Sequence, residues 1–580
     1  MSAPTATTTA QHAEPMSHRQ ILEALSGLLL VLFVALLSST VVSTALPRII
    51  GALHGSQTQY TWVVTATLLT ATATTPIWGK LADLFNKKAL VQISIVVFVL
   101  GSAVAGLSQS AGQLIAARAF QGIGVGGLQA LVQVAIAAMI PPRERGRYNG
   151  YLGGVMALAT VGGPLLGGLI VDTSWLGWRW CFFVGVPVAI VALIVLQATL
   201  HLPTIRRDNV KIDYLGASLI AAGVSVLLIW VSFVDNSFDW FSWQTAAMVG
   251  ASLLLLALAV LVESRAAEPV VPLKIVRERT TALAILASVA VGMAMFGGAV
   301  FLGQYFQIGR GYSPTEAGLL TIPLMAGVLG ASIVAGQLIT RTGRIRPYII
   351  TGLVVLAAGF AMLGTIDHQT SLVYVGAGMF LVGVGVGMSM QNLVLAVQNT
   401  VALRDIGAAS STVAFFRSLG GAMGVSVLGA VLAHRVTDRI THDLSAAGIP
   451  ADGSSGGGTL DLASLPAPIA QIVRSAYGDA TGHIFLISAA IAVLGLLAAL
   501  LFKPVTLRTS LDLPDATAAA GEAAGAVGGA PVPEPAPEPA AGSTPGSTPG
   551  STPDEASDGV PGGAGTGVDG RAATGSAPRR

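Results

Sequence analysis

The chain has 580 residues, of which 53% are hydrophobic and only 10% are charged, and its mean hydropathy is +0.72. Such a composition excludes a water-soluble domain of this size and indicates a membrane protein. The formal net charge of +2 says nothing by itself about a nucleic-acid partner, but the Lys and Arg lie in short loops instead of on one basic face, so we expect no nucleic-acid partner. The single Cys181 excludes an intramolecular disulfide and a cysteine-based metal cluster.

Apolar segments of about 20 residues recur along the chain, each long enough as a helix to cross a hydrocarbon core of about 30 Å. They are too long for barrel strands and lack the alternation of such strands. We therefore predict an all-α polytopic membrane protein with fourteen transmembrane helices. The predicted spans are 21–46, 57–78, 89–109, 112–139, 149–172, 180–201, 214–234, 243–262, 281–307, 314–339, 348–365, 371–398, 406–433 and 483–503.

Basic residues gather in the loops between even-numbered and odd-numbered spans. They are Lys80, Lys87, Lys88, Arg143, Arg145, Arg147, Arg206, Arg207, Lys211, Arg265, Lys274, Arg277, Arg279, Arg341, Arg344, Arg346 and Arg404. The opposite short loops carry little beyond Arg48, Arg179 and Arg310. Because cytoplasmic loops carry the excess of Lys and Arg, we predict that both termini are cytoplasmic.

Three stretches outside the spans are polar or of low complexity. We predict a disordered cytoplasmic leader (1–20), an external loop (434–482) with an interfacial helix near Ile469 to Tyr477, and a disordered cytoplasmic tail (504–580). The tail is rich in Ala, Pro and Gly and contains GSTPGSTPGSTP, so it cannot bury a core.

An internal repeat divides the spans into two sets. The stretch from Gly122 to Gly146 aligns without gaps on Gly383 to Gly407, and GKLADLFNKKAL, which begins at Gly79, is echoed by GQLITRTGRIRP from Gly336. We predict two related six-helix halves, 21–201 and 281–503, separated by two inserted helices with their linkers (202–280). Parallel repeats of this kind are a transporter architecture in which the substrate lies between the halves.

The hairpin after the second span resembles the signature of the major facilitator superfamily, through Gly79, Asp83, Lys87 and Lys88. The fourteen spans resemble its larger drug:proton antiporter branch. The resemblance implies that these four residues form a conformational latch, in which the Asp83 carboxylate lies at a helix N-terminus of the other half, or pairs with an Arg, in only one of two states. The alternative is a loop that is basic only because of membrane orientation.

Two further stretches resemble motifs of the same family. Arg118 and Gln121 resemble its Arg-x-x-Gln-Gly motif and place a charge inside a span, where it marks a functional site or an arginine that snorkels to the interface. The stretch GPLLGG of this chain resembles the motif that is associated with exporters of the family. Its residues are Gly163, Pro164, Gly167 and Gly168. Generic packing of small residues between helices is the alternative for these glycines.

The first span differs at two positions from the corresponding motif of the drug:proton antiporter branch. Ser38 stands where the branch carries Asp, and Ser43 where it carries Asn. The resemblance implies a proton gradient as the energy source and no cofactor, but the expected carboxylate for proton coupling is missing. Other polar candidates for a cavity between the halves are Thr65, Thr67, Gln304, Tyr305, Gln391, Asn392 and Arg417, although a helix-to-helix hydrogen bond is an alternative for each.

The resemblance favours a monomeric multi-pass exporter in the plasma membrane, surrounded by lipid, which moves amphipathic small molecules by alternating access. An uptake permease and a lipid or siderophore exporter of the same fold remain alternatives. A membrane-embedded enzyme is a remote one, because the eight His are scattered and no H-E-x-x-H motif occurs. Without an acid at Ser38, we expect neutral, zwitterionic or weakly anionic substrates rather than permanent cations.

Overall fold

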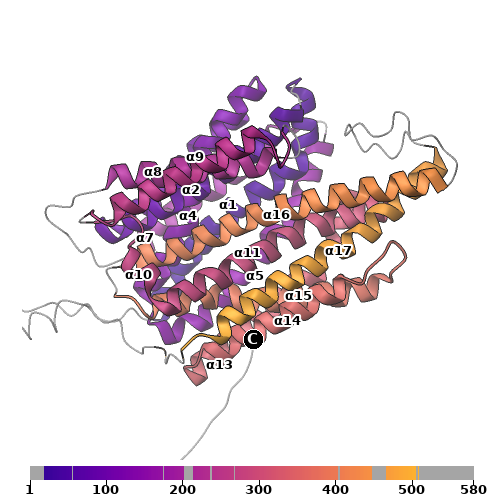
Figure 1. Cartoon of the computed structure of the whole chain (residues 1–580). Coiled ribbons are helices and arrows are strands. Elements are labelled where there is room, and N and C mark those ends of the chain that lie inside the picture. The colour runs from indigo at the N-terminus through magenta and orange to yellow at the C-terminus, as the bar shows by residue number, and fades with distance from the viewer. Residues whose placement is uncertain are drawn as a thin grey trace, which may run out of the picture. The chain divides into compact units, whose positions relative to one another are not determined.

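The computed structural model describes residues 18–54, 57–173, 175–200, 213–234, 238–266, 268–402, 405–446, 466–503 and 507, which belong to one compact unit, Met1–Thr517. Three predicted segments fall partly or wholly outside these residues: most of the leader, the middle of the loop 434–482, and the tail apart from Leu507. Figure 1 shows the described helices packed side by side as a bundle.

The first half of the bundle contains α1 (His18–Ala52), α2 (Gln57–Leu84), α3 (Lys87–Gly106), α4 (Ala111–Met139), α5 (Pro142–Asp172), α6 (Trp180–Phe183) and α7 (Gly185–Thr199). Turn chemistry sets several of these boundaries. The side chain of Asn86 accepts a hydrogen bond from the Ala89 amide and caps α3, Ser110 caps α4 in the same way, and Pro142 opens α5.

The inserted segment contains α8 (Tyr214–Phe233), α9 (Trp243–Glu263) and the short α10 (Leu273–Arg277). The second half contains α11 (Arg279–Gln304), the π-helical turn η1 (Tyr305–Gly309), α12 (Pro314–Leu320), α13 (Ile322–Thr342), α14 (Arg346–Leu363), α15 (Leu372–Gln398), α16 (Ile406–Ala446) and α17 (Ala467–Leu500).

Each of the fourteen predicted spans corresponds to a helix or to two consecutive helical pieces. The spans 180–201, 281–307 and 314–339 are divided, into α6 with α7, α11 with η1, and α12 with α13. Thirteen of the described helical segments are long and apolar enough to cross a membrane by composition alone. The remaining predicted span is α2, whose many threonines lower its hydropathy although it packs inside the bundle.

The repeated glycines perform the same packing role in both halves. A Cβ on Gly122 or Gly126 of α4 would collide with the backbone of α2, and one on Gly124 would meet Phe98 of α3. In the second half, Gly383 and Gly387 of α15 approach α13 in the same way, and Gly385 lies against Leu356 of α14. The repeat therefore places α4 between α2 and α3, and α15 between α13 and α14, as two copies of one three-helix unit.

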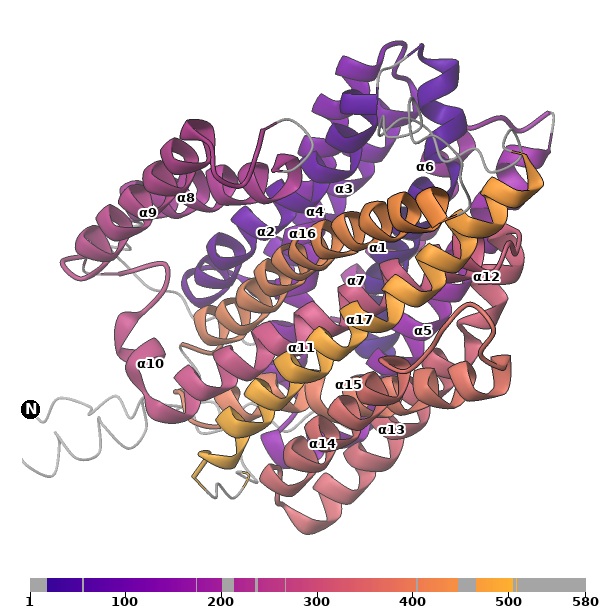
Figure 2. The same cartoon turned by 45° about the vertical axis from the view of Figure 1, so that its right-hand side comes forward.

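The two halves meet along two helix pairs, α2 with α16 and α5 with α13. In Figure 2, α16 lies beside α2, and α13 and α5 lie on the other side of the bundle. We call the end of the bundle at which α2 ends and α3 begins the Asp83 end. Helices α4, α13 and α15 also end there, and α5, α14 and α16 begin there.

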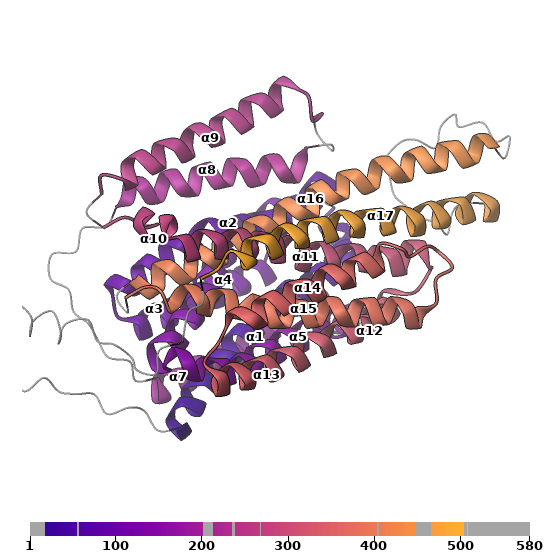
Figure 3. The ribbon, with the colours of Figure 1, turned by 60° about the horizontal axis from the view of Figure 1, so that its bottom comes forward.

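The inserted pair packs on one of these two junctions. Ala217, Ile220 and Val224 of α8 share an apolar cluster with Phe415 of α16, and Leu69 and Ile77 of α2 line the same cluster. Figure 3 shows α8 and α9 together at the α2 and α16 side of the bundle. The insertion thus contacts both halves, whereas α9 leaves most of its apolar surface uncovered, as a lipid-facing helix does.

The predicted external loop is shorter than expected. Helix α16 continues to Ala446, and α17 already begins at Ala467, so that the predicted interfacial helix is the first part of α17. Figure 3 shows α16 and α17 running alongside each other to the same end. The expectation failed because it ended the helix where charges begin. An apolar stripe, Leu432, Val436, Ile440 and Leu444, continues beyond that point and packs on the protein.

Candidate functional site

The carboxylate of Asp83 joins the two halves. Its Oδ1 accepts a hydrogen bond from the Gly407 amide and its Oδ2 accepts one from the Ala408 amide, both at 2.7 Å. These amides belong to the first turn of α16, where N–H groups lack partners within the helix and the dipole favours an anion. Of the two pairings expected for this carboxylate, the one with a helix N-terminus of the other half is therefore present in this structure.

Glycine permits this contact. A Cβ on Gly79 would collide with Ser411 of α16 and lie 2.6 Å from the Gly407 carbonyl oxygen, and a Cβ on Gly407 would collide with the backbone of Gly79 and with Asp83. The two backbones touch at this point, which brings the α16 amides within reach of a short Asp side chain. Gly79 and Asp83 thus form one unit with the start of α16.

The lysines near this unit have separate partners. Lys88 donates to the Gln197 carbonyl at the end of α7, at 2.7 Å, and so lies within its own half. Lys87 is half-buried, and its positive charge favours the ionised form of the Asp83 carboxyl. Lys80, which is buried, forms a 2.6 Å ion pair with Glu268 in the linker that follows α9. The inserted segment is thereby tied to α2 one turn before Asp83.

The second junction, between α5 and α13, repeats the close approach without a carboxylate. A Cβ on Gly146 would lie 2.6 Å from the Gly336 carbonyl oxygen, and a Cβ on Gly336 would collide with the Gly146 carbonyl. Here Arg143 donates through Nε to the Thr340 carbonyl at 3.2 Å. A cation thus meets the last carbonyls of α13, which is the reverse arrangement to that of Asp83.

Arg145 links four helices between these two junctions. It is 2% exposed and donates to the carbonyls of Ala137 at 2.6 Å and Ile140 at 2.7 Å. Its Nη1 donates to the side chain of Gln398 on α15 at 2.8 Å, and Gln398 donates in turn to Ser410 on α16 at 2.8 Å. Each of the three guanidinium nitrogens therefore donates one hydrogen bond, and together they tie α5 to the end of α4 and to α15.

The next contact between the halves lies further from the Asp83 end. Gln133 of α4 donates to the side-chain oxygen of Gln391 on α15 at 2.8 Å. The neighbouring Asn392 is 2% exposed and donates to the Met388 carbonyl, whereas its Oδ1 is buried without a hydrogen-bond partner. Gln391 and Asn392, both predicted, thus lie at the boundary of the halves.

Arg118 and Gln121 form a second polar group inside the first half. Nη1 of Arg118 donates to Oε1 of Gln121 at 2.6 Å, and Nε2 of Gln121 donates to Ser102 at 2.6 Å and to Ser38 at 3.3 Å. Thr67 donates to the Arg118 carbonyl at 3.2 Å. The structure therefore brings the predicted motif of Arg118 and Gln121 together with Ser38 and Thr67, which the sequence predicted separately, and adds Ser102 of α3. Thr65 is also buried on α2.

Three predicted residues lie elsewhere. Ser43 is exposed and donates to the Ser39 carbonyl within α1. Gln304 is half-buried at the end of α11. Tyr305 is fully buried at the end opposite Asp83, where its hydroxyl donates to the Asp367 carbonyl and accepts from Arg310 at 3.0 Å.

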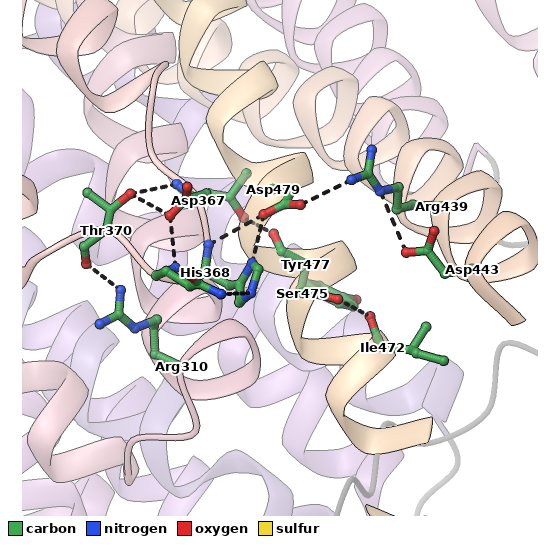
Figure 4. A network of polar contacts seen from close by, with 12 residues as sticks. Arg310, Asp367, His368, Thr370, Arg439, Asp443, Ile472, Ser475, Tyr477 and Asp479 are labelled. Atoms are coloured by element: carbon green, nitrogen blue, oxygen red, sulfur yellow. Dashed lines mark hydrogen bonds and ion pairs between the residues drawn. The ribbon is translucent and has the colours of Figure 1, made fainter. Parts of the chain in front are cut away.

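Figure 4 shows the polar network that surrounds this position. Asp479 of α17 meets His368 of the loop between α14 and α15 at 3.1 Å and Arg439 of α16 at 3.4 Å. The Thr370 hydroxyl and the Gln369 amide donate to Asp367, and they hold the pKa of that carboxyl below its usual range. All these groups belong to the second half, so this network fixes the α14–α15 loop and does not join the halves.

The glycines of the predicted exporter motif pack within the first half. A Cβ on Gly163 would collide with Thr40 of α1, and one on Gly167 would lie 2.8 Å from the Val41 carbonyl oxygen. Gly168 has open space around it, and Pro164 lies inside α5 between these contacts. Helix α5 thus uses its first turns against α13 of the other half and its later turns against α1.

Sequence reasoning missed three residues that join the halves, Gln133, Arg145 and Gln398. It also missed Ser410, which binds Gln398, and Glu268, which ties the inserted segment to α2. Arg145 was interpreted only as an orientation charge. One signal was available for Gln133 and Gln398, because each is an amide on an apolar span, but their partners lie more than 250 residues away or on another helix.

The comparison with known sequences identifies the family. The profile described as Major Facilitator Superfamily matches residues 28–425. The chain belongs to the major facilitator superfamily. It is therefore a multi-pass membrane protein of a transporter family.

Relatives extend this finding. The chain is 34% identical to the multidrug transporter protein MdtP of Bacillus subtilis (strain 168), over 74% of this chain and 79% of MdtP. It is 32% identical to the efflux pump dotC of Dothistroma septosporum, over 84% of both chains. The crystal structure of the human organic anion transporter MFSD10 superposes with a TM-score of 0.54 at 14% identity, covering 83% of this chain and 99% of that chain, which shows the shared fold.

Proposed function

We propose that this transporter exports amphipathic, drug-like small molecules across the plasma membrane by alternating access, driven by the proton gradient. The observation that carries the proposal is the contact of Asp83 with the amides of Gly407 and Ala408. A single carboxylate that binds the first turn of a helix from the other half makes a contact that exists only while this end is closed. The names of the relatives MdtP and dotC support export rather than uptake.

In this mechanism, Asp83 and Gly79 act as a latch that closes the Asp83 end, supported by Arg143, Arg145 and Gln133. The latch breaks when the end opens to admit substrate, and it forms again as the opposite end opens for release. A contact of a few kcal/mol biases such an equilibrium without abolishing either state. The protein works as a monomer surrounded by lipid and needs no cofactor, because the energy comes from the gradient.

Export is tested with inverted membrane vesicles that contain the protein and a panel of amphipathic compounds. We expect saturable, gradient-dependent uptake of at least one drug-like compound into these vesicles, and loss of that uptake when a protonophore collapses the gradient. Uptake into right-side-out vesicles alone would support the permease alternative. Transport that persists without any proton gradient would contradict the proposed energy source.

We further propose that the Asp83 end faces the cytoplasm, because basic residues gather there. Single cysteines test this, since the native Cys181 is buried and 1% exposed. Phe85 is exposed beside Asp83, and Gly112 has open space at the opposite end. In intact cells, we expect a membrane-impermeant maleimide to label Gly112→Cys and not Phe85→Cys. The reverse pattern would invert the proposed topology.

A further inference from the structure

Besides Arg145, two arginines of the described residues are buried, Arg118 and Arg417, and they differ in the hydrogen bonds that their guanidinium groups make. Arg118, 3% exposed, donates to Gln121 at 2.6 Å and points Nε toward the Val63 carbonyl at 3.5 Å. Arg417 of α16 is 7% exposed, and its Nη1 is buried with no hydrogen-bond partner among the described residues. The first guanidinium is therefore accommodated by the protein, whereas the second is left with an open donor.

A buried guanidinium without an acceptor is costly, because it has lost water and gained no counter-charge. The helices that contact α16 supply none at this level: the sequences of α4, α8, α11 and α15 contain no Asp or Glu, and the one acid of α2, Asp83, binds the first turn of α16. The acids of α16 and α17 are Asp438, Asp443 and Asp479, all of which lie near the opposite end. The acceptor for Arg417 has to come from outside these helices.

Helical register shows where Arg417 lies relative to the boundary of the halves. The antiparallel helices α15 and α16 are joined by the hydrogen bond from Gln398 to Ser410. Seven residues further from the Asp83 end, roughly two helical turns or 10 Å, each helix returns to nearly the same face. These positions are Gln391 on α15 and Arg417 on α16.

At this level of the bundle, two buried polar side-chain atoms have no hydrogen-bond partner among the described residues. Gln391 is bonded to Gln133 of the first half, so the level lies at the boundary of the halves. Within the described part of the chain, Oδ1 of the adjacent Asn392 is an acceptor without a donor, and Nη1 of Arg417 is a donor without an acceptor. Elsewhere at the boundary, toward the Asp83 end, Arg145 and Gln398 satisfy each other.

We propose that Arg417 binds an anionic oxygen of the transported molecule, and that Asn392 accepts a hydrogen bond from a donor on the same molecule. The proposal rests on the export function above and names its substrate class: amphiphiles that carry a carboxylate, a phenolate or a similar anionic oxygen. Opening of the Asp83 end separates Gln133 from Gln391 and gives such a molecule access to this level.

The test uses the full-length protein in lipid nanodiscs and measures equilibrium binding of radiolabelled cholate and of its methyl ester. These two probes share one hydrophobic body and differ in the negative charge. We expect the wild-type protein to bind cholate about tenfold more tightly than the ester, because a charge-assisted hydrogen bond to a buried arginine is lost in the ester. Equal affinities would overturn the proposal without any variant.

Variants then assign the effect to Arg417. We expect Arg417→Gln to raise the Kd for cholate about tenfold and to leave the Kd for the ester within about twofold, and Arg417→Lys to be intermediate. The matched control is Arg435→Gln, the same change at an exposed arginine of α16, which should alter neither Kd. An equal loss for both probes would make Arg417 a structural residue and overturn the proposal.

The binding assay separates this proposal from the export function. If the wild-type protein exports compounds of the vesicle panel but binds no cholate, the anionic substrate class is wrong and export stands. If it binds cholate through Arg417 but transports nothing in vesicles, the site stands and the export function is wrong.

Discussion

Asp83→Asn is expected to reduce export about 10-fold to 100-fold while leaving the amount of folded protein in the membrane nearly unchanged. The carboxylate accepts one hydrogen bond on each oxygen, from Gly407 and Ala408. An asparagine at this position retains one acceptor oxygen and turns an amide group toward a backbone donor. One buried donor is then unsatisfied, and the negative charge at the α16 N-terminus is lost.

The loss affects only the state in which the Asp83 end is closed, so it should appear as a change in populations. Spin labels on Phe85→Cys and Thr342→Cys, both exposed at this end and belonging to different halves, report its opening when Cys181 is replaced by Ala. We expect Asp83→Asn to shift the distance distribution of these labels to longer values.

The matched control for this prediction is Asp438→Asn, the same substitution at an exposed position of α16. It should leave both export and the distance distribution unchanged. An Asp83→Asn protein that exports at the wild-type rate would show that the contact is not needed for transport.

The fold could be predicted to a large extent because its determinants are local. Each span was predicted from the composition of its own segment. The glycine spacing from Gly122 to Gly146 recurs in the second half, and this recurrence predicted the two related halves. A contact of Asp83 with the other half, through a helix N-terminus or an Arg, was also predicted. What the sequence did not specify was which helix would provide the amides, because Gly407 lies 324 residues away.

The bridging polar residues could not be predicted, and the reason is physical. Arg145 in isolation is a basic residue of a loop, and only the assembled structure shows that it is buried against Gln398 and the carbonyls of Ala137 and Ile140. Two other buried arginines, Arg118 and Arg417, illustrate the same limit. Arg118 and Arg417 both stand as lone charges on apolar spans, yet one is satisfied within its own half and the other is not.

Gly336→Val is expected to reduce export at least about tenfold, because overpacking of a close contact costs roughly 1–3 kcal/mol. The helices α5 and α13 touch backbone to backbone here, where a Cβ on Gly336 would collide with the Gly146 carbonyl. A side chain can be accommodated only if the two halves move apart. The substitution therefore opposes closure of the Asp83 end at the junction that lacks Asp83.

The same helix offers a matched control, Gly330→Val, since a Cβ on Gly330 has no atom within 4 Å. Both changes cost the same helix propensity, so any difference between them reports the contact with α5. We expect only Gly336→Val to lengthen the distance between the labels at Phe85 and Thr342, and Gly336→Ala to do so more weakly. If Gly336→Val and Gly330→Val export equally and give the same distances, close approach of α5 and α13 is not required for transport. A loss of export without a change in distance would instead assign Gly336 to a step other than closure of this end.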